Sequence, residues 1–229
     1  MSKIKNLSWQ DALKRLKEGN ERFQKDKLDG QLQDSKRRGS LTGGQSPYAI
    51  ILSCADSRVV PELAFDTGLG EIFVIRVAGN IANTSSVASI EYAVAHLGVN
   101  LIMVLGHESC GAVGAAIAGG DNGHNLNMLL AHITPAVCIE KERMEERDKL
   151  VRQKDKEARE GNNEFAQLGE PAQLDTNDVV RTNAAFNATD LYNRSSIIRG
   201  AVDSRNLKII PAFYNLGSGK VDCLSHCEA

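Results

Sequence analysis

The sequence Tyr48-Ala-Ile-Ile-Leu-Ser-Cys54 is an apolar run that ends on a cysteine, and it decides the class of fold. Two runs of the same kind follow it, Ile72-Phe-Val-Ile-Arg-Val77 and Leu101-Ile-Met-Val-Leu105. Strands that are apolar on both faces are typical of a parallel sheet covered by helices on both sides. The segment from Ser85 to Leu97 has helical spacing of apolar residues and can cross over between the last two runs. The sequence therefore predicts an α/β fold with a mostly parallel β-sheet flanked by helices.

The rest of the chain divides into further helices, loops and strands. Ser8 and Asp11 have the spacing of a capping box, which predicts a helix over 8–25. Further helices are expected at 111–118, 126–137 and 179–199, a loop at 25–46, and strands at 207–216 and 221–224. We interpret residues 1–229 as one domain, with an N-terminal helical arm at 8–25, a charged surface segment at 140–164 and a C-terminal tail at 225–229.

Composition and charge exclude several classes of protein. A length of 229 residues with 42% hydrophobic and 24% charged residues is ordinary for one globular domain. The net charge of −2 gives no electrostatic reason to bind nucleic acid or an anionic membrane, so a small-molecule substrate is expected. The N-terminus lacks the apolar run of a secretory signal, and no stretch is long enough to span a membrane. Five widely spaced cysteines are not a disulfide framework, so we expect reduced thiols and a cytoplasmic protein.

Two short motifs follow the first and third apolar runs. The first is Cys54-Ala-Asp56-Ser-Arg58 and the second is His107-Glu-Ser-Cys110. Two thiolates and one imidazole suit Zn²⁺, and three protein ligands leave one tetrahedral position open, as in catalytic zinc sites. Arg58 can hold the Asp56 carboxylate ionised and oriented beside the metal. On the alternative interpretation, the cysteines are core residues and Asp56 with Arg58 is a helix cap and a surface ion pair.

These motifs resemble those of the β-class carbonic anhydrases. Three other segments match the family in order and spacing: Gly19-Asn20-Glu-Arg22-Phe23, Phe73-Val-Ile-Arg76-Val-Ala-Gly79-Asn80 and Ser89-Ile-Glu91-Tyr92-Ala-Val. Together the matches cover residues 8–118, about half of the chain. A histidine and a cysteine at this spacing would alone be weak evidence for the family, whereas the ordered set of motifs is highly specific.

The resemblance implies a role for each matching residue. It makes Cys54, His107 and Cys110 the zinc ligands, with Asp56 and Arg58 as the catalytic pair. Gln45 matches a glutamine whose amide donates to bicarbonate, and Phe73, Ala78 and Tyr92 match the apolar CO₂ pocket, where Ala78 is smaller than the usual valine. His96, four residues after Tyr92, matches a position proposed for proton transfer. Gln45 as an ordinary loop residue and His96 as a structural histidine remain open.

The implied function is the reversible hydration of carbon dioxide to bicarbonate and a proton by zinc-bound hydroxide, with one Zn²⁺ per subunit. The family also implies a homodimer or homotetramer, with the N-terminal helix packed on a partner and the active cleft near the subunit interface. Two alternatives remain. One is a hydrolase of CS₂ or COS on the same zinc scaffold. The other is a non-catalytic zinc-binding sensor of the same fold, against which the intact pair Asp56 and Arg58 argues.

Regulation by bicarbonate is not expected. Some bacterial members of the family bind bicarbonate at a non-catalytic pocket formed by a tryptophan, an arginine and a tyrosine. Here Arg76 and Tyr214 match, but Ile51 occupies the tryptophan position and has no N–H to donate to an anion. We therefore expect Asp56 to pair with Arg58 at neutral pH. Cys138 lies on an apolar helix face and is expected in the core, and Cys223, His226 and Cys227 near the C-terminus are expected to be incidental rather than a second zinc site.

Overall fold

The computed structural model describes residues 7–160 and 173–224. Its centre is a five-stranded sheet in the order β2-β1-β3-β4-β5. The strands are β1 (Ala49–Ser53), β2 (Ile72–Arg76), β3 (Leu101–His107), β4 (Lys208–Tyr214) and β5 (Val221–Cys223). The pairings among β2, β1, β3 and β4 are parallel and only β5 runs antiparallel to its neighbour, so the predicted mostly parallel sheet is confirmed.

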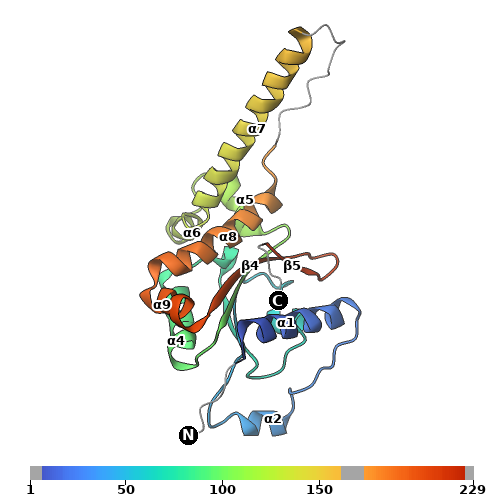
Figure 1. Ribbon diagram of the computed structural model, residues 1–229, viewed down its shortest axis with the longest axis vertical. Helices are drawn as coiled ribbons and strands as arrows, with labels where there is room; N and C mark the ends of the chain where they lie inside the picture. Colours follow the sequence, from blue (N-terminus) through green and yellow to red (C-terminus); the bar gives the residue numbers. More distant parts are fainter. Residues whose placement is uncertain (1–6, 161–172, 225–229) are drawn as a thin grey trace.

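Helices cover both faces of the sheet, which explains the continuous apolar runs. Ile50 and Leu52 of β1 pack on one side with α4 (Thr84–His96), α8 (Thr176–Arg194) and α9 (Ser196–Arg205). Ala49 and Ile51 alternate with them and pack on the other side with α1 (Trp9–Gln24). Figure 1 shows α4 and α9 on one side of the sheet and α1 on the other. Every residue of β1 and β3 is buried, because both strands lie inside the sheet with helices above and below.

The N-terminal helix begins as the sequence predicts. Ser8 caps it by accepting a hydrogen bond from the Asp11 backbone N–H at 3.1 Å. The apolar face of α1, formed by Ala12, Leu13 and Leu16, is completely buried in this chain's own core. Contact between α1 and a partner subunit, which the family resemblance led us to expect, would therefore use the opposite, polar face of the helix.

The helices differ from the prediction in three segments. The expected loop at 25–46 contains a short helix, α2 (Ser35–Ser40), because the Asp34 side chain caps it by accepting from the Arg37 N–H at 2.8 Å. The expected helix at 126–137 is divided into α6 (His124–Leu130) and the start of α7 (Thr134–Glu160). The expected helix at 179–199 is divided between α8 and α9 at Ser195, which caps α9 through the Ile198 N–H. The other helical segments are α3 (Pro61–Ala64), the 3₁₀ turn η1 (Ala78–Asn80) and α5 (Gly111–Ala118).

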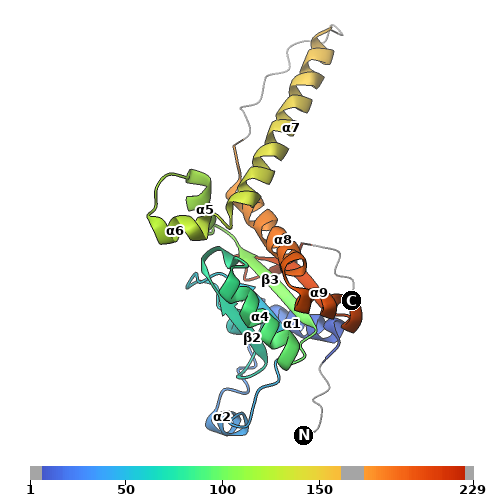
Figure 2. The same cartoon turned by 90° about the vertical axis from the view of Figure 1, so that its left-hand side faces the viewer.

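Helix α7 extends far beyond the body of the molecule (Figures 1 and 2). Its base is tied to α8, where the buried carboxylate of Glu140 accepts hydrogen bonds from Thr182 and Arg143. The prediction that Cys138 lies in the core is wrong: it is exposed, because Val137 and Glu140 occupy the inward face of this turn. The expected C-terminal tail at 225–229, with His226 and Cys227, lies outside the described residues. Among the described helices, none has both the length and the apolar composition needed to cross a membrane.

Candidate metal site

The three predicted metal ligands meet at the C-terminal edge of the sheet. Cys54 follows the last residue of β1, His107 ends β3, and Cys110 is the residue before the first turn of α5. Their ligand atoms all lie within 4.8 Å of one another, and the two sulfur atoms are 4.0 Å apart. All three side chains are buried. Strands β1 and β3 are parallel neighbours in the sheet, so the two motifs at their C-terminal ends lie together although they are distant in sequence.

The arrangement of donor atoms fits a zinc ion. The Nδ1 atom of His107 lies 2.9 Å from the Glu108 backbone oxygen, so Nδ1 carries the proton and Nε2 presents a lone pair. That buried Nε2 atom has no hydrogen-bond partner among the described residues, which would be unfavourable without a ligand. One imidazole lone pair facing two sulfurs is a donor set that zinc prefers, and it leaves one tetrahedral position open.

The contact between the Cys54 and Cys110 sulfur atoms shifts the pKa of both thiols. The hydrogen bond between Cys110 and Cys54 lowers the pKa of the Cys54 thiol, and the hydrogen bond from the Gly79 N–H lowers it further. The same sulfur contact, together with burial, raises the pKa of Cys110. The 4.0 Å contact is a sulfur–sulfur hydrogen bond, so at least one of the two sulfurs carries a proton. A soft divalent cation would displace that proton, because thiolates and not thiols bind metals.

Asp56 and Arg58 form the predicted pair beside these ligands. The Arg58 Nε and Nη2 atoms donate to Asp56 Oδ1 at 3.0 Å and Oδ2 at 2.8 Å, a two-point contact. Arg58 therefore holds the pKa of the Asp56 carboxyl well below its usual range. The Asp56 Oδ2 atom is 3.8 Å from His107 Nε2, too far for a hydrogen bond. The carboxylate thus lies next to the metal ligands but is held by the guanidinium.

Arg76 has a role that the sequence did not reveal. Its guanidinium donates to the backbone oxygens of Cys54 at 3.0 Å and Asp56 at 2.6 Å, so it fixes the loop that follows β1. Tyr214 is buried on β4, which is separated from the β2 strand of Arg76 by β1 and β3. Three strand spacings amount to roughly 14 Å.

Four other predicted residues lie away from the ligands of their own chain. Phe73 pairs with Ile50, and the four residue steps from Ile50 to Cys54 span about 13 Å along the strand. Tyr92 contacts Phe73 and His96, with ring centres 6.4 Å and 5.1 Å apart, so this aromatic group lies toward the opposite edge of the sheet. Gln45 is exposed and precedes β1, on that same edge. Ala78, by contrast, immediately precedes Gly79, whose N–H contacts the Cys54 sulfur.

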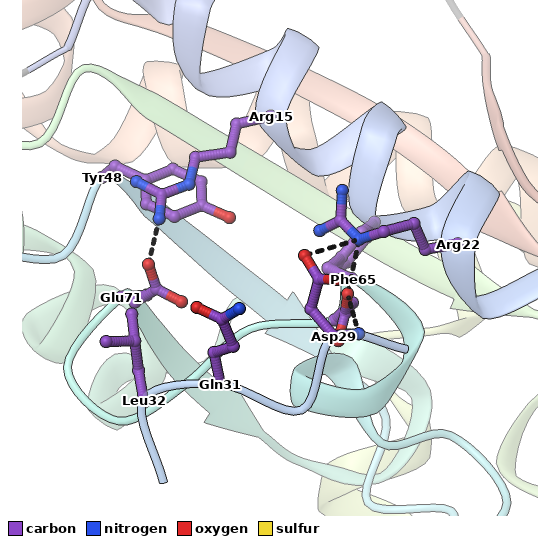
Figure 3. Close-up of a pocket in the computed structure, with 9 residues that line it drawn as sticks. Arg15, Arg22, Asp29, Gln31, Leu32, Tyr48, Phe65 and Glu71 are labelled. Atoms are coloured by element: carbon purple, nitrogen blue, oxygen red, sulfur yellow. Dashed lines mark hydrogen bonds and ion pairs between the residues drawn. The ribbon is translucent and has the colours of Figure 1, made fainter. Parts of the chain in front are cut away.

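A separate polar cavity of about 120 Å³ lies under α1 (Figure 3). Its lining includes Arg15, which pairs with Glu71, and Arg22, which pairs with Asp66. The buried hydroxyl of Tyr48 also belongs to it and has no partner within the described part of the chain. Since Tyr48 precedes β1, this cavity is at the opposite end of the strand from Cys54, and its charges are already paired. It does not contribute to the metal site.

Comparison with known proteins agrees with the site. The family model described as "Carbonic anhydrase" matches residues 49–221, and this chain belongs to that family. The carbonic anhydrase of Mycolicibacterium smegmatis is 34% identical over 219 residues, covering 94% of this chain and 93% of that protein. Carbonic anhydrase 2 of Mycobacterium tuberculosis is 52% identical over 112 residues, which span 49% of this chain and only 54% of that relative.

Solved structures place the fold in the β class. A β-carbonic anhydrase from Sordaria macrospora, described as tetrameric, matches with a TM-score of 0.65 and 25% identity, covering 84% of this chain and 87% of its own. The CafA β-carbonic anhydrase of Aspergillus fumigatus matches with a TM-score of 0.63 over 96% of this chain and 91% of its own, and at 23% identity it supports the fold alone. The resemblance found in the sequence is confirmed.

Proposed function

We propose that this chain is a zinc-dependent carbonic anhydrase that catalyses the reversible hydration of carbon dioxide to bicarbonate and a proton. The observation that carries the proposal is the convergence of Cys54, His107 and Cys110 within 4.8 Å, next to a carboxylate that is paired with Arg58. Family membership supports the same reaction. A structural zinc site would not require an ionised carboxylate held beside its open position.

The residues divide the chemistry among them. Cys54, His107 and Cys110 would hold one zinc ion per chain, which supplies the Lewis acidity that lets water lose a proton near neutral pH. Asp56 stays ionised because Arg58 donates to both of its oxygens, so it can accept a hydrogen bond from the reacting water and orient it. The Glu108 backbone oxygen fixes the His107 ring through Nδ1. Arg76 fixes the backbone around Cys54 and Asp56.

Stopped-flow measurement of CO₂ hydration, with and without a zinc chelator, tests the proposal. Chelator-sensitive hydration supports it, and no hydration by the zinc-loaded protein contradicts it and favours the sensor. A parallel assay with CS₂ and COS decides between the two kinds of enzyme.

We also propose a cytoplasmic location, because the Cys54 and Cys110 ligands need a compartment that keeps thiols reduced. Fractionation of cells that express the protein would contradict this if the protein were found outside the cytoplasm.

We propose a homo-oligomer in which Gln45, Phe73 and Tyr92 of one subunit complete the CO₂ pocket of another. The proposal rests on their position, since one chain does not bring them to its own metal ligands. It is supported by the exposure of Tyr92, 49%, which is high for an aromatic residue that contacts Phe73. The tetramer described for the Sordaria relative is consistent with it. His96, in contact with Tyr92, would then lie near the partner's site and could carry protons there.

Mixed oligomers are expected to regain activity from two defective subunits. Gln45→Ala would damage the site of the neighbouring subunit, and Asp56→Asn would damage the subunit's own site. Refolding the two variants together should therefore restore hydration above the mean of the separate proteins, because some sites receive both intact residues. The measurement is stopped-flow hydration on the co-refolded mixture, with each variant refolded alone as its control. Activity equal to that mean would contradict a shared site.

Inhibition by bicarbonate is expected to follow a simple, non-cooperative curve. Ile51 is buried in the core and offers no side-chain donor, and the guanidinium of Arg76 already donates to two backbone oxygens. An anion would therefore lack the differential affinity needed to favour a second state of the site. Initial rates over a range of bicarbonate concentrations at constant ionic strength would check this. A sigmoidal inhibition curve, or a crystal structure near neutral pH with Asp56 on the metal, would contradict it.

A further inference from the structure

Helix α8 carries two buried asparagines that face the turn η1 beside the metal ligands. Asn183 is completely buried, and its Nδ2 atom donates to the Gly79 backbone oxygen at 2.8 Å. Asn187 Oδ1 accepts from the Ala82 N–H at 2.7 Å, and Asn187 Nδ2 donates to Asn183 Oδ1 at 3.0 Å. Because Ala82 can only donate at that contact, the orientation of both amides is determined, and Asn183 must present its N–H₂ group to Gly79.

Gly79 is the link between α8 and the sulfur of Cys54. Its N–H donates to Cys54 Sγ at 3.3 Å, while its carbonyl is held by Asn183. The residue has φ +72, a left-handed conformation that favours glycine, and an added Cβ would lie 2.6 Å from the Ile133 Cδ1 atom, which would have to move. Glycine has the freest backbone of all residues. Holding the Gly79 carbonyl restricts rotation about the two backbone bonds of this residue, and so limits the directions that its N–H can take.

We propose that Asn183 is a positioning residue for the metal site, which aims the Gly79 N–H at the Cys54 thiolate. The inference rests on the proposed metal function and extends it to α8. A hydrogen bond to a ligating sulfur withdraws charge from it, so the sulfur donates less charge to a bound cation. Asn183 thereby sets how strongly Cys54 neutralises the metal, although it contacts neither the metal nor the substrate.

The competing explanation is that Asn183 is simply a satisfied buried amide. Asn20 provides a matched control, because it is also buried and makes the same kinds of bond. Its Nδ2 atom donates to the oxygens of Ala64 at 2.9 Å and Gly219 at 2.8 Å, and its Oδ1 atom accepts from the Val221 N–H at 3.0 Å. None of these partners is a metal ligand or contacts one in the described structure. Loss of Asn20 should lower stability without changing the ligand sulfur.

Cobalt substitution separates the two explanations. We expect Asn183→Ala, and Asn183→Asp, which keeps the side-chain volume but removes the donor, to shift the sulfur-to-cobalt charge-transfer band to lower energy. The reason is that a sulfur without the Gly79 hydrogen bond holds its electrons less tightly. We also expect zinc affinity, measured by competition with a chelator, to fall by about 10–100-fold, because the loss of the group that orients this ligand outweighs the stronger donation from the freed sulfur. Asn20→Ala should lower the unfolding temperature and leave both the band and the affinity at wild-type values.

Three results would overturn the inference. The first is a wild-type cobalt spectrum and zinc affinity in the Asn183 variants, and the second is an equal band shift in Asn20→Ala. The third concerns the wild-type protein and applies even if no variant folds: after loading with ¹¹³Cd and ¹⁵N-glycine labelling, scalar coupling should join the metal to the Gly79 amide proton, and its absence contradicts the proposal. If wild-type protein shows no cobalt–thiolate band at all, the metal function itself fails, which is a different result from an unshifted variant.

Discussion

Cys54→Ser, His107→Ala and Cys110→Ser are each expected to remove most of the bound zinc and, with it, CO₂ hydration. The three ligand atoms lie within 4.8 Å of one another in a buried site, so the loss of any one leaves an incomplete donor set. Elemental analysis should find about one zinc per chain in the wild type and a small fraction of that in each variant. Full zinc occupancy in all three variants would contradict the ligand assignment.

Cys138→Ser is the matched control for this experiment. Cys138 is exposed on α7 and is not part of the described metal cluster, so its replacement should leave the zinc content unchanged. Added zinc should raise the unfolding temperature of metal-free wild type and of Cys138→Ser, because a ligand that binds only the folded chain stabilises it. The three ligand variants should show little or none of this increase.

Asp56→Asn is expected to retain zinc and to lower kcat for hydration by a factor on the order of 10² or more, as is usual when a group that orients the reacting water loses its charge. Arg58→Ala should act similarly, because it removes the two-point contact that keeps Asp56 away from the ligands. The freed carboxylate has only a short distance to cover, since its Oδ2 atom is 3.8 Å from His107 Nε2. Stopped-flow hydration and metal analysis on the same samples provide both readouts.

The ion pair of Asp190 and Arg194 on α8 supplies a control for the pair of Asp56 and Arg58. Arg194 Nη1 donates to Asp190 Oδ2 at 3.0 Å, and Asp190 is partly buried, as Asp56 is. Asp190→Asn removes the charge of a paired carboxylate away from the metal ligands and should leave kcat unchanged. Near wild-type hydration in both Asp56→Asn and Arg58→Ala would mean that this pair has a structural role and none in catalysis.

Features that depend on neighbouring residues in sequence could be predicted. The three apolar runs predicted the buried strands, because a strand covered on both faces needs apolar residues at every position. The closeness of the three residues that could hold a metal ion could be predicted, because their motifs lie at the ends of two parallel strands, and such ends meet at one edge of the sheet. The boundary at Ser195 was missed because a serine inside a helical pattern does not by itself show whether it caps a new helix.

Features that depend on tertiary contacts could not be predicted. The family position of Arg76 gives no sign of the bonds that its guanidinium donates to the Cys54 and Asp56 backbone oxygens, because these depend on the path of the loop after β1. Asn183 contacts Gly79 across more than 100 positions of sequence, and no local pattern marks it. Cys138 was placed in the core because an apolar helix face shows that one side is buried but does not decide the exact residues at its border.

In the zinc enzyme proposed above, the pairing of β1 with β3 would also make metal binding depend on correct folding. Cys54 follows β1 and His107 ends β3, and these strands are joined in the register Ile50 to Ile102, a contact between segments separated by β2 and α4 in sequence. Such long-range pairing forms late and slowly compared with local helices. A slip of one residue would turn the side chains that follow β1 to the opposite face of the sheet. Cys54 would then face away from His107, so only a chain with the native register could bind the metal. Metal binding would therefore stabilise the native register relative to the shifted one.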